Sequence, residues 1–370
     1  MKTGLPFLLG FSRWSRRREP SSGVLIVASG GLGDAVLFSL VLPRLTRLAN
    51  DGEQVTLLVP ASTAKMSFLF GPGVETLPVD YNRLANERPY RFEFKAKLKE
   101  RCFRLVISTD YLRHPKRDEL LIKACNAPEC VAMYARPWTK YDRLLDKNRR
   151  LYTRLFESGP PLLDKVIRWT LFANWLTGED LPPPPIRLPG AQWPAENTAL
   201  RSTVILAPFS AVPEKQSSAK LWETILETLP PGHDIIVTGA PGDLTKNPAF
   251  QALLARSNVT YDDSSFESLA PHLRVAKLVI SVDTATMHLS VALGALTLCL
   301  ASAAYVNEIV PYAPEISPPN AHIIYTPMDC QSCLGQCVHA AENGMYPCVA
   351  RINPGQVIRK IRALLGENAG

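Results

Sequence analysis

Two apolar segments, one in each half of the chain, end abruptly in glycine and polar residues. The first begins at Val24 and runs into the sequence GGLGD at 30–34, and the second, Leu278–Val282, runs into Asp283. Short, almost continuous apolar runs are typical of strands buried in a parallel sheet. Polar residues directly after such strands lie at the edge of an open α/β sheet where ligands bind. One such edge in each half predicts two sheets that face each other across a central cleft.

The rest of the chain alternates further strand and helix patterns. The expected strands are Val24–Ser29, Val55–Pro60, Leu105–Thr109, Val204–Ala207, Asp234–Thr238, Leu278–Val282 and Leu296–Leu300. The expected helices are Ala35–Ala49, Lys165–Leu176, Lys220–Leu229, Met287–Leu293 and Pro354–Leu365. Strand–helix–strand units of this kind form right-handed parallel sheets. The expected fold class is therefore α/β, with two doubly wound, Rossmann-like domains.

Four consecutive prolines, Pro182–Pro185, divide the chain. Such a run cannot continue a helix or lie in the centre of a sheet, and it forms a stiff, extended spacer. A length of 370 residues also exceeds what one hydrophobic core usually holds. We therefore expect a basic arm at 1–22, a first domain at 23–181, a proline-rich linker at 182–190, a second domain at 191–353 and a C-terminal helix at 354–370.

The net charge of +7 is concentrated in the N-terminal arm and in the segment 136–154. Both are either solvated faces or contacts for an anionic membrane surface or a phosphorylated acceptor. Neither contains a helix-turn-helix or an aromatic RNA-binding motif, so nucleic acid is not an expected partner. The apolar stretch of the arm precedes its basic cluster, which is the reverse of a secretory signal, and no run is long enough to cross a bilayer. A cytoplasmic location is expected.

The segment 30–34 matches neither standard nucleotide-binding motif. It is not GxGxxG, and no Gly-Lys-Ser/Thr follows it. Its glycines nevertheless allow a tight turn and the close approach of a ligand. Asp34 has two interpretations: an acidic residue that caps a helix start, or a general base that takes a proton from an acceptor hydroxyl.

Two further segments have the residue types of an anion site. In the loop before the helix at 220, Ser217, Ser218 and Lys220 can meet a phosphate, although a surface loop with a solvated lysine has the same composition. The segment 283–288 (DTATMH) combines hydroxyls with the free amides of a helix start. Its Asp283 is alternatively a helix cap, and its His288 alternatively a buried histidine with a satisfied partner.

Four of the eight cysteines gather in one short segment: Cys330, Cys333, Cys337 and Cys348. Four thiolates so close in sequence can form a tetrahedral zinc or iron site. A cytoplasmic location argues against a disulfide framework, and free or disulfide-capable thiols remain the alternative. In either case we expect the cluster to hold a loop and not to take part in catalysis. The other four cysteines have the surroundings of ordinary buried thiols.

The order of these motifs resembles glycosyltransferase family 9, which includes the ADP-heptose:lipopolysaccharide heptosyltransferases. The resemblance is carried by GGLGDAVLFSLVLPRL from 30, APFS with SSAKLWE from 207, IIVTGAPGD from 235 and LVISVDTATMHLSVALGALTLCL from 278. It extends from Val24 to the final helix and is strongest at Gly33-Asp34, at Lys220-Leu221-Trp222 and at 283–288.

The resemblance implies a GT-B fold, with the acceptor in the N-terminal half and the nucleotide sugar in the C-terminal half. Position by position, Asp34 resembles the catalytic base, Gly31 and Gly33 the acceptor-side loop, and Lys220 the lysine that binds the diphosphate. The expected donor-binding residues are Ser217, Ser218, Lys220, Gly239, Asp243, Asp283, Thr284, Ala285, Thr286 and His288. Ala285 departs from the family, which usually has glycine there, and its methyl narrows the approach to the donor phosphates.

The resemblance also implies a function: inverting transfer of a heptose or related sugar from ADP-heptose to a lipopolysaccharide core acceptor. No DxD motif stands out, so catalysis is expected to need no metal. Such an enzyme would bind a phosphorylated glycolipid and touch the inner face of the inner membrane. The alternatives are another nucleotide-sugar donor, a protein acceptor, or a non-catalytic assembly module stabilised by metal. One branch of the family, the autotransporter heptosyltransferases, binds iron at a similar cysteine cluster.

Overall fold

The computed structural model describes residues 23–190, 193 and 202–366, so the basic arm at 1–22 lies outside the described residues. The predicted α/β class is confirmed, because the described chain forms two six-stranded parallel sheets flanked by helices. The first sheet consists of β1 (Val24–Val27), β2 (Val55–Pro60), β3 (Val74–Val79), β4 (Leu105–Ser108), β5 (Glu129–Met133) and β6 (Arg154–Phe156). The second consists of β7 (Val204–Ala207), β8 (Ile235–Thr238), β9 (Val259–Asp262), β10 (Leu278–Val282), β11 (Thr297–Leu300) and β12 (Ala321–Ile324).

Both sheets have the same topology. The first has the strand order β3-β2-β1-β4-β5-β6, and the second, read from β9, has the equivalent order β9-β8-β7-β10-β11-β12. This is the order of dinucleotide-binding sheets, in which the direction of winding reverses between the first and fourth strands. Those strands are β1 and β4 in one domain and β7 and β10 in the other. Ligands are therefore expected at the carboxyl ends of these four strands.

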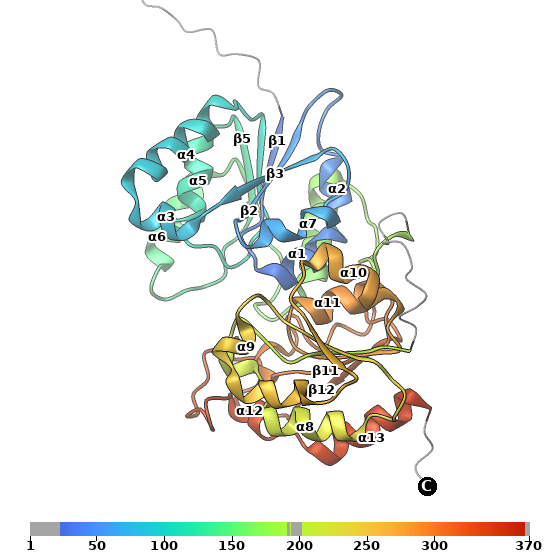
Figure 1. Cartoon of the computed structure of the whole chain (residues 1–370). Helices are drawn as coiled ribbons and strands as arrows, with labels where there is room; N and C mark the ends of the chain where they lie inside the picture. Colours follow the sequence, from blue (N-terminus) through green and yellow to red (C-terminus); the bar gives the residue numbers. More distant parts are fainter. Residues whose placement is uncertain (1–22, 191–192, 194–201, 367–370) are drawn as a thin grey trace, which may run out of the picture.

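Helices cover both faces of each sheet (Figure 1). Their bounds are α1 Leu32–Ser39, α2 Leu42–Thr46, α3 Tyr81–Asn86, α4 Arg88–Glu100, α5 Asp118–Cys125, α6 Asp142–Asn148, α7 Lys165–Thr177, α8 Ala219–Thr228, α9 Asp243–Lys246, α10 Phe266–Val275, α11 Ala285–Ala292, α12 Pro347–Ala350 and α13 Pro354–Leu365. None of the helices in the described part of the chain has the length and apolar character needed to cross a bilayer.

The two domains share one hydrophobic cluster. In Figure 1, α1, α10 and α11 lie between the two sheets. Leu37 of α1 and Trp169 of α7 belong to the same buried cluster as Leu269 of α10 and Met287 of α11. The opposite faces of the sheets carry separate clusters, which include α4 and α5 in the first domain and α8 and α13 in the second. The junction between the domains is therefore built like a core.

The helix predicted at Ala35–Ala49 was wrong in its extent. It consists of two helices, α1 from Leu32 to Ser39 and α2 from Leu42 to Thr46. Pro43 explains the break, because a proline within one continuous helix would lack the N–H that bonds to Ser39 and would clash with the preceding turn. As the second residue of α2, the same proline is well accommodated.

Candidate active site

The glycine loop after β1 meets the start of α11 where the two domains join. Gly33, in the first turn of α1, lies so close to His288 that a β-carbon on Gly33 would be 2.9 Å from Cδ2 of the histidine ring. Real β-carbons do not approach a neighbour so closely, so only glycine fits here without a shift of the His288 ring or of one of the two helices. The carboxyl ends of β1 and β10 thus open onto the same place, and their polar residues are brought together.

Asp34 is held by two donors. Its Oδ2 accepts a hydrogen bond from the Gly31 amide (3.0 Å), and its Oδ1 lies 2.7 Å from Nζ of Lys165 at the start of α7. Burial by itself would raise the pKa of Asp34, but the Lys165 ammonium and the Gly31 amide outweigh it and hold the pKa below its ordinary value. Asp34 is thus both a capping residue and an ionised carboxylate at the domain junction.

His288 is buried and has one satisfied nitrogen. Its Nδ1 lies 2.8 Å from the hydroxyl of Tyr312, and only 3% of the residue is exposed. Burial lowers the pKa of His288 to about 4, against the opposing effect of Asp283 and Asp34. The ring is therefore neutral at physiological pH, as expected of a buried histidine with a partner, and it interacts with carboxylates from both domains.

Asp283 forms an ion pair with Lys215 and does not cap α11. The Lys215 Nζ atom lies 2.8 Å from Oδ2 of Asp283, and both side chains are largely buried. Lys215 also lies over the ring of Tyr305, 4.7 Å from its centroid. The N-cap position of α11 belongs to Thr284, which makes no side-chain capping bond. The alternative interpretation of Asp283 as a helix cap is thus wrong.

Several polar atoms around this ion pair have unused hydrogen-bonding capacity. Within the described chain, the Ser217 hydroxyl is buried without a hydrogen-bond partner, and Oδ2 of Asp283 meets Lys215 outside hydrogen-bond geometry. The uncapped start of α11, which contains Ala285 and Thr286, adds free amides. Buried polar groups in folded proteins are almost always paired. This arrangement therefore suits a ligand with negatively charged oxygens.

Ser218 and Lys220, at the start of α8, lie outside this cluster. Ser218 is the N-cap of α8, and its hydroxyl accepts a hydrogen bond from the Leu221 amide (3.3 Å). Lys220 is exposed on α8, and its ammonium has no partner among the described residues. The lysine that the fold brings to Asp283 is Lys215, five positions earlier.

Gly239 and Asp243 lie at the carboxyl end of β8, beside β7. A β-carbon on Gly239 would be 2.6 Å from the ring of Phe209, in the loop after β7, and 2.7 Å from the Tyr261 hydroxyl. Oδ2 of Asp243 accepts a hydrogen bond from the Ala240 amide (2.7 Å). The loop 239–243 is therefore packed closely at the same edge of the second sheet as Asp283.

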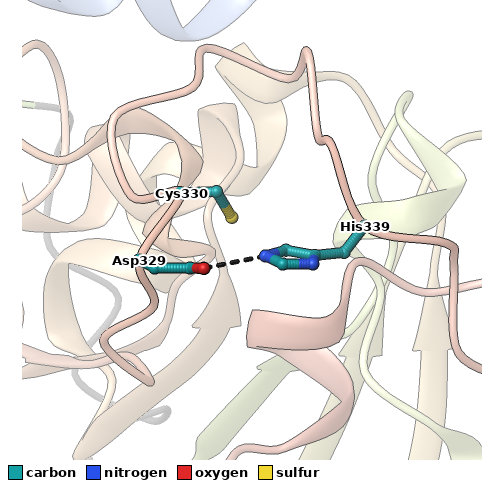
Figure 2. Close-up of side chains that lie close together, drawn as sticks. All are labelled: Asp329, Cys330 and His339. Atoms are coloured by element: carbon teal, nitrogen blue, oxygen red, sulfur yellow. Dashed lines mark hydrogen bonds and ion pairs between the residues drawn. The ribbon is translucent and has the colours of Figure 1, made fainter.

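The cysteine-rich segment forms a loop that precedes and includes α12. In the described residues, one group has the ligand spacing of a metal site: Asp329, Cys330 and His339, whose ligand atoms lie within 4.8 Å of one another. Nε2 of His339 lies 2.7 Å from the Asp329 carboxylate (Figure 2). Burial, followed by a hydrogen bond with Cys337, raises the pKa of Cys330 to about 11. Burial, followed by the nearby Cys337 and Cys333 thiols, raises the pKa of Cys348.

The predicted metal ligands are thus only partly brought together. Of the four cysteines, Cys330 is the one that belongs to the compact group, and Asp329 and His339 complete it. Cys348 Sγ instead accepts a hydrogen bond from the Ala303 amide (3.4 Å). Crowded thiols beside a histidine and a carboxylate fit the ligand preferences of zinc or iron.

Three charged residues of this junction were not predicted from the sequence: Lys165, Lys215 and Asp110. Asp110 follows β4, and its Oδ2 accepts a hydrogen bond from the Ser29 amide (2.6 Å). The pattern used for Asp34 and Asp283, a polar residue directly after a buried strand, would have identified it. Lys215 could have been considered as a phosphate-binding residue, because it is the first lysine after β7. No local signal places Lys165 beside Asp34.

No family model matches the sequence, and no curated protein matches it. Solved structures do match. One is a glycosyl transferase family 9 protein from Veillonella parvula, with a TM-score of 0.67 and 17% identity over 94% of this chain and 98% of that one. Another is the E. coli heptosyltransferase WaaC with ADP-2-deoxy-2-fluoro heptose, with a TM-score of 0.65 and 18% identity over 94% and 99%.

A more distant match is the dodecameric iron-containing heptosyltransferase TibC in complex with ADP-D-beta-D-heptose. Its TM-score is 0.51, with 12% identity over 93% of this chain and 76% of that one. Identities this low establish the fold alone. The chain therefore has the GT-B fold of the family 9 glycosyltransferases, and the resemblance seen in its motifs is confirmed at that level.

Proposed function

We propose that this protein is an inverting glycosyltransferase that transfers a heptose, or a related sugar, from ADP-heptose to a lipopolysaccharide core acceptor. The observation that carries the proposal is the junction itself. An ionised carboxylate of the first domain, Asp34, and a cation of the second domain, Lys215, both interact electrostatically with His288, and Ser217 near that cation in sequence is buried without a partner. The GT-B fold of the matching structures supports this assignment.

The proposed reaction needs opposite charges on its two sides. The acceptor hydroxyl attacks the anomeric carbon, its proton passes to Asp34, and the bond to the diphosphate breaks on the opposite face of the sugar. The configuration inverts in this single displacement, and the leaving ADP gains negative charge. A carboxylate on the attacking side and fixed cations and amides on the leaving side are the groups that stabilise such a transition state.

We assign the contact with the diphosphate to Lys215, supported by the amides and hydroxyls at the start of α11. Lys215 is largely buried beside Asp283, whereas Lys220 is exposed. Lys220 remains a candidate for the outer edge of the donor site, together with Ser218. Gly239 and Asp243, at the end of β8, are proposed to face the nucleoside. Because these groups supply the cationic environment, the proposed reaction needs no divalent metal.

ADP-heptose is the proposed donor because two of the matching structures hold it or its fluoro analogue. The proposed acceptor is a phosphorylated glycolipid at the inner face of the inner membrane. The basic segment 136–154 supports this choice, since it continues from β5 at the same edge of the first sheet. A different nucleotide sugar or a protein acceptor is the second candidate, and Ala285 is the residue that favours a change of donor.

Nucleotide binding tests the proposal. A ligand that binds only the folded protein raises its melting temperature with increasing affinity and concentration. We expect ADP and ADP-heptose to stabilise the protein and UDP and GDP sugars to leave it unchanged. Stabilisation by another nucleotide would transfer the proposal to that donor class. A protein that binds no nucleotide sugar, with native structure verified by circular dichroism, would favour the assembly module and overturn the proposed enzyme.

We further propose that the loop 329–348 holds a structural zinc or iron ion. Cys330, Asp329 and His339 would bind it, with Cys337 or Cys333 as the fourth ligand, and the ion would fix the loop without entering the reaction. The test is metal analysis of protein purified without oxygen, with Cys330→Ser as the comparison. A stoichiometry near one that falls in the variant supports the site, and a stoichiometry near zero in both proteins excludes it.

A further inference from the structure

Asp34 lies among charges from every element that surrounds it. Lys165 of α7 forms an ion pair with its Oδ1 at 2.7 Å, and Asp110, which follows β4, lines the same small cavity. His288 of α11 faces it from the second domain, with its ring neutral. Tyr305 also interacts electrostatically with Asp34 and Lys165. Lys165 is thus the cation that directly contacts Asp34 in this group.

The carboxyl group of Asp110, in the same small cavity, affects the ionisation of Asp34. Burial, and then the charge of Asp118, raises the pKa of Asp110 to about 7, with a smaller contribution from Asp34. Two neighbouring carboxyl groups in a poorly hydrated site do not both ionise readily, and one of them tends to keep a proton. Without a compensating cation, the pKa of Asp34 would also rise. Asp34 would then be protonated and could not accept a proton from an acceptor hydroxyl.

Lys165 is placed to provide that compensation. Burial disfavours its charged form, but Asp34, Glu308 and Asp110 raise its pKa above the ordinary value. Lys165 therefore stays charged in the pocket. Its ammonium contacts Asp34 on one oxygen only, so the carboxylate keeps lone pairs for an acceptor hydroxyl.

Both domains hold the start of α7 that carries Lys165. The Lys165 amide donates to the Glu308 carbonyl (3.0 Å), and the carboxylate of Asp164 accepts from the Ala313 amide (3.1 Å). The Glu308 side chain in turn forms an ion pair with Arg136 of the first domain (3.3 Å). The position of Lys165 therefore depends on the contact between the two domains.

We propose that Lys165 is a positioning residue that keeps Asp34 ionised and oriented as the proton acceptor when the domains are closed. The inference rests on the proposed function, because it gives Asp34 the role of base. Lys165 of α7, in the proposed acceptor domain, thus controls the protonation state of the proposed base. The ionisation of Asp34 is then coupled to the contact of α7 with the segment 308–313.

The test is the pH dependence of kcat/KM in four proteins: wild type, Lys165→Met, Lys165→Arg and Lys97→Met. Lys97 is exposed on α4, far from the junction in sequence and fold, and serves as the matched control. We expect Lys165→Met to move the acid limb upward by about one to two pH units, the usual effect of one adjacent charge. Lys165→Arg and Lys97→Met should keep the limb of the wild type.

The double variant Lys165→Met/Asp110→Asn separates electrostatics from structure. Removal of the second carboxylate should return the acid limb toward its wild-type position, although Lys165 is still missing. A loss of activity in Lys165→Met that is uniform at all pH values, and that Asp110→Asn leaves unchanged, would overturn the proposal and assign Lys165 a purely structural role.

A direct titration keeps this inference distinct from the proposed function. The carboxyl carbons of 13C-labelled protein, with Asp34→Asn used to assign the signal, report the pKa of Asp34 without any substrate. A higher pKa in Lys165→Met than in Lys165→Arg supports the electrostatic role even if no sugar transfer is found. Equal pKa values in the two variants overturn it, even if the enzyme proves active. A variant that does not fold is replaced in both experiments by Lys165→Gln.

Discussion

Gly33 of the first domain and His288 of the second lie in direct contact across the domain junction. The missing side chain of Gly33 is what allows α1 and α11 to approach, since a β-carbon there would lie 2.9 Å from the imidazole ring. Asp34 of the first domain and Asp283 of the second both interact electrostatically with this histidine. The closeness of the proposed base and donor groups thus depends on a single glycine.

Replacement of Gly33 by alanine is expected to push the two domains apart. Overpacking in a well-packed site typically costs about 1–3 kcal/mol, and relief requires α11 to move away from α1. We expect a lower melting temperature and a larger radius of gyration in small-angle scattering. Gly31→Ala is the matched control for compactness, since a β-carbon on Gly31 meets nothing within 4 Å. Identical scattering from both variants would contradict this explanation of Gly33.

Replacement of Asp34 by asparagine is expected to reduce kcat by about 10²–10⁴-fold, the usual contribution of a general base. Asparagine can still accept the hydrogen bond from Gly31, so the start of α1 should persist. The measurement is the rate of ADP release in the presence of acceptor, with stabilisation by ADP as the check of folding. Asp51→Asn, in an exposed turn, is the control. Near-normal turnover of a folded Asp34→Asn enzyme would show that the base lies elsewhere.

Lys215, in the loop before α8, and Lys220, in the first turn of α8, are expected to differ in nucleotide binding. Lys215→Met should weaken the affinity for ADP by about tenfold or more, because a charge-assisted hydrogen bond contributes roughly 1.5–3 kcal/mol. Lys220→Met should change it by less than about threefold, as for an exposed charge. Calorimetric titration of both variants measures the difference. The reverse order of effects would restore Lys220 to the role that the family resemblance implies.

The low pKa of His288 predicts a pH-dependent loss of stability. The unfolded chain takes up a proton near pH 6.5, whereas the folded protein does so only near the value of about 4. The free energy of unfolding should therefore fall as the pH decreases from 6.5 toward 4, by up to about 3 kcal/mol from this group. Urea unfolding of wild type and His288→Gln at pH 7 and pH 4.5 isolates its share. If the free energy of unfolding falls equally in both proteins between pH 7 and pH 4.5, His288 is not buried as a neutral ring.

All the interior strands except β5 were predicted from the sequence, and the edge strands were not. β5 (ECVAM) lies inside the first sheet, but its short run begins with a glutamate. β1 and β10 are buried on both faces, which requires continuous apolar runs such as Val24–Val27. β3 and β9 lie at sheet edges, and their exposed or half-buried positions accept polar residues, as in the sequences VETLPV and VTYD. Their apolar pattern is too weak to distinguish a strand from a loop. The pattern of apolar residues therefore indicates which strands are buried more reliably than it indicates where strands occur.

The proposed site was predictable only where a residue follows a buried strand. Asp34 and Asp283 were found in this way, and their proximity follows from the fold. The contact of Lys165 with Asp34 joins positions 131 residues apart, and nothing in the composition of α7 indicates it. Lys215 and Lys220 are of the same residue type and lie five positions apart, so the sequence does not distinguish them. The backbone path places Lys215 in the loop beside Asp283 and Lys220 on the exposed face of α8.

The single apolar cluster that joins α1 and α7 to α10 and α11 limits how this chain can be recombined. Separating the chain at the four prolines would expose the apolar surface of this cluster on each half. Each half expressed alone is therefore expected to aggregate. In a chimera that takes its C-terminal half from a homologue, the new α10 and α11 would have to pack against the original α1 and α7. The apolar residues of all four helices would therefore have to be compatible. If the proposed function holds, point changes around Ala285 should alter the proposed donor preference with less disturbance of this cluster than exchange of whole halves.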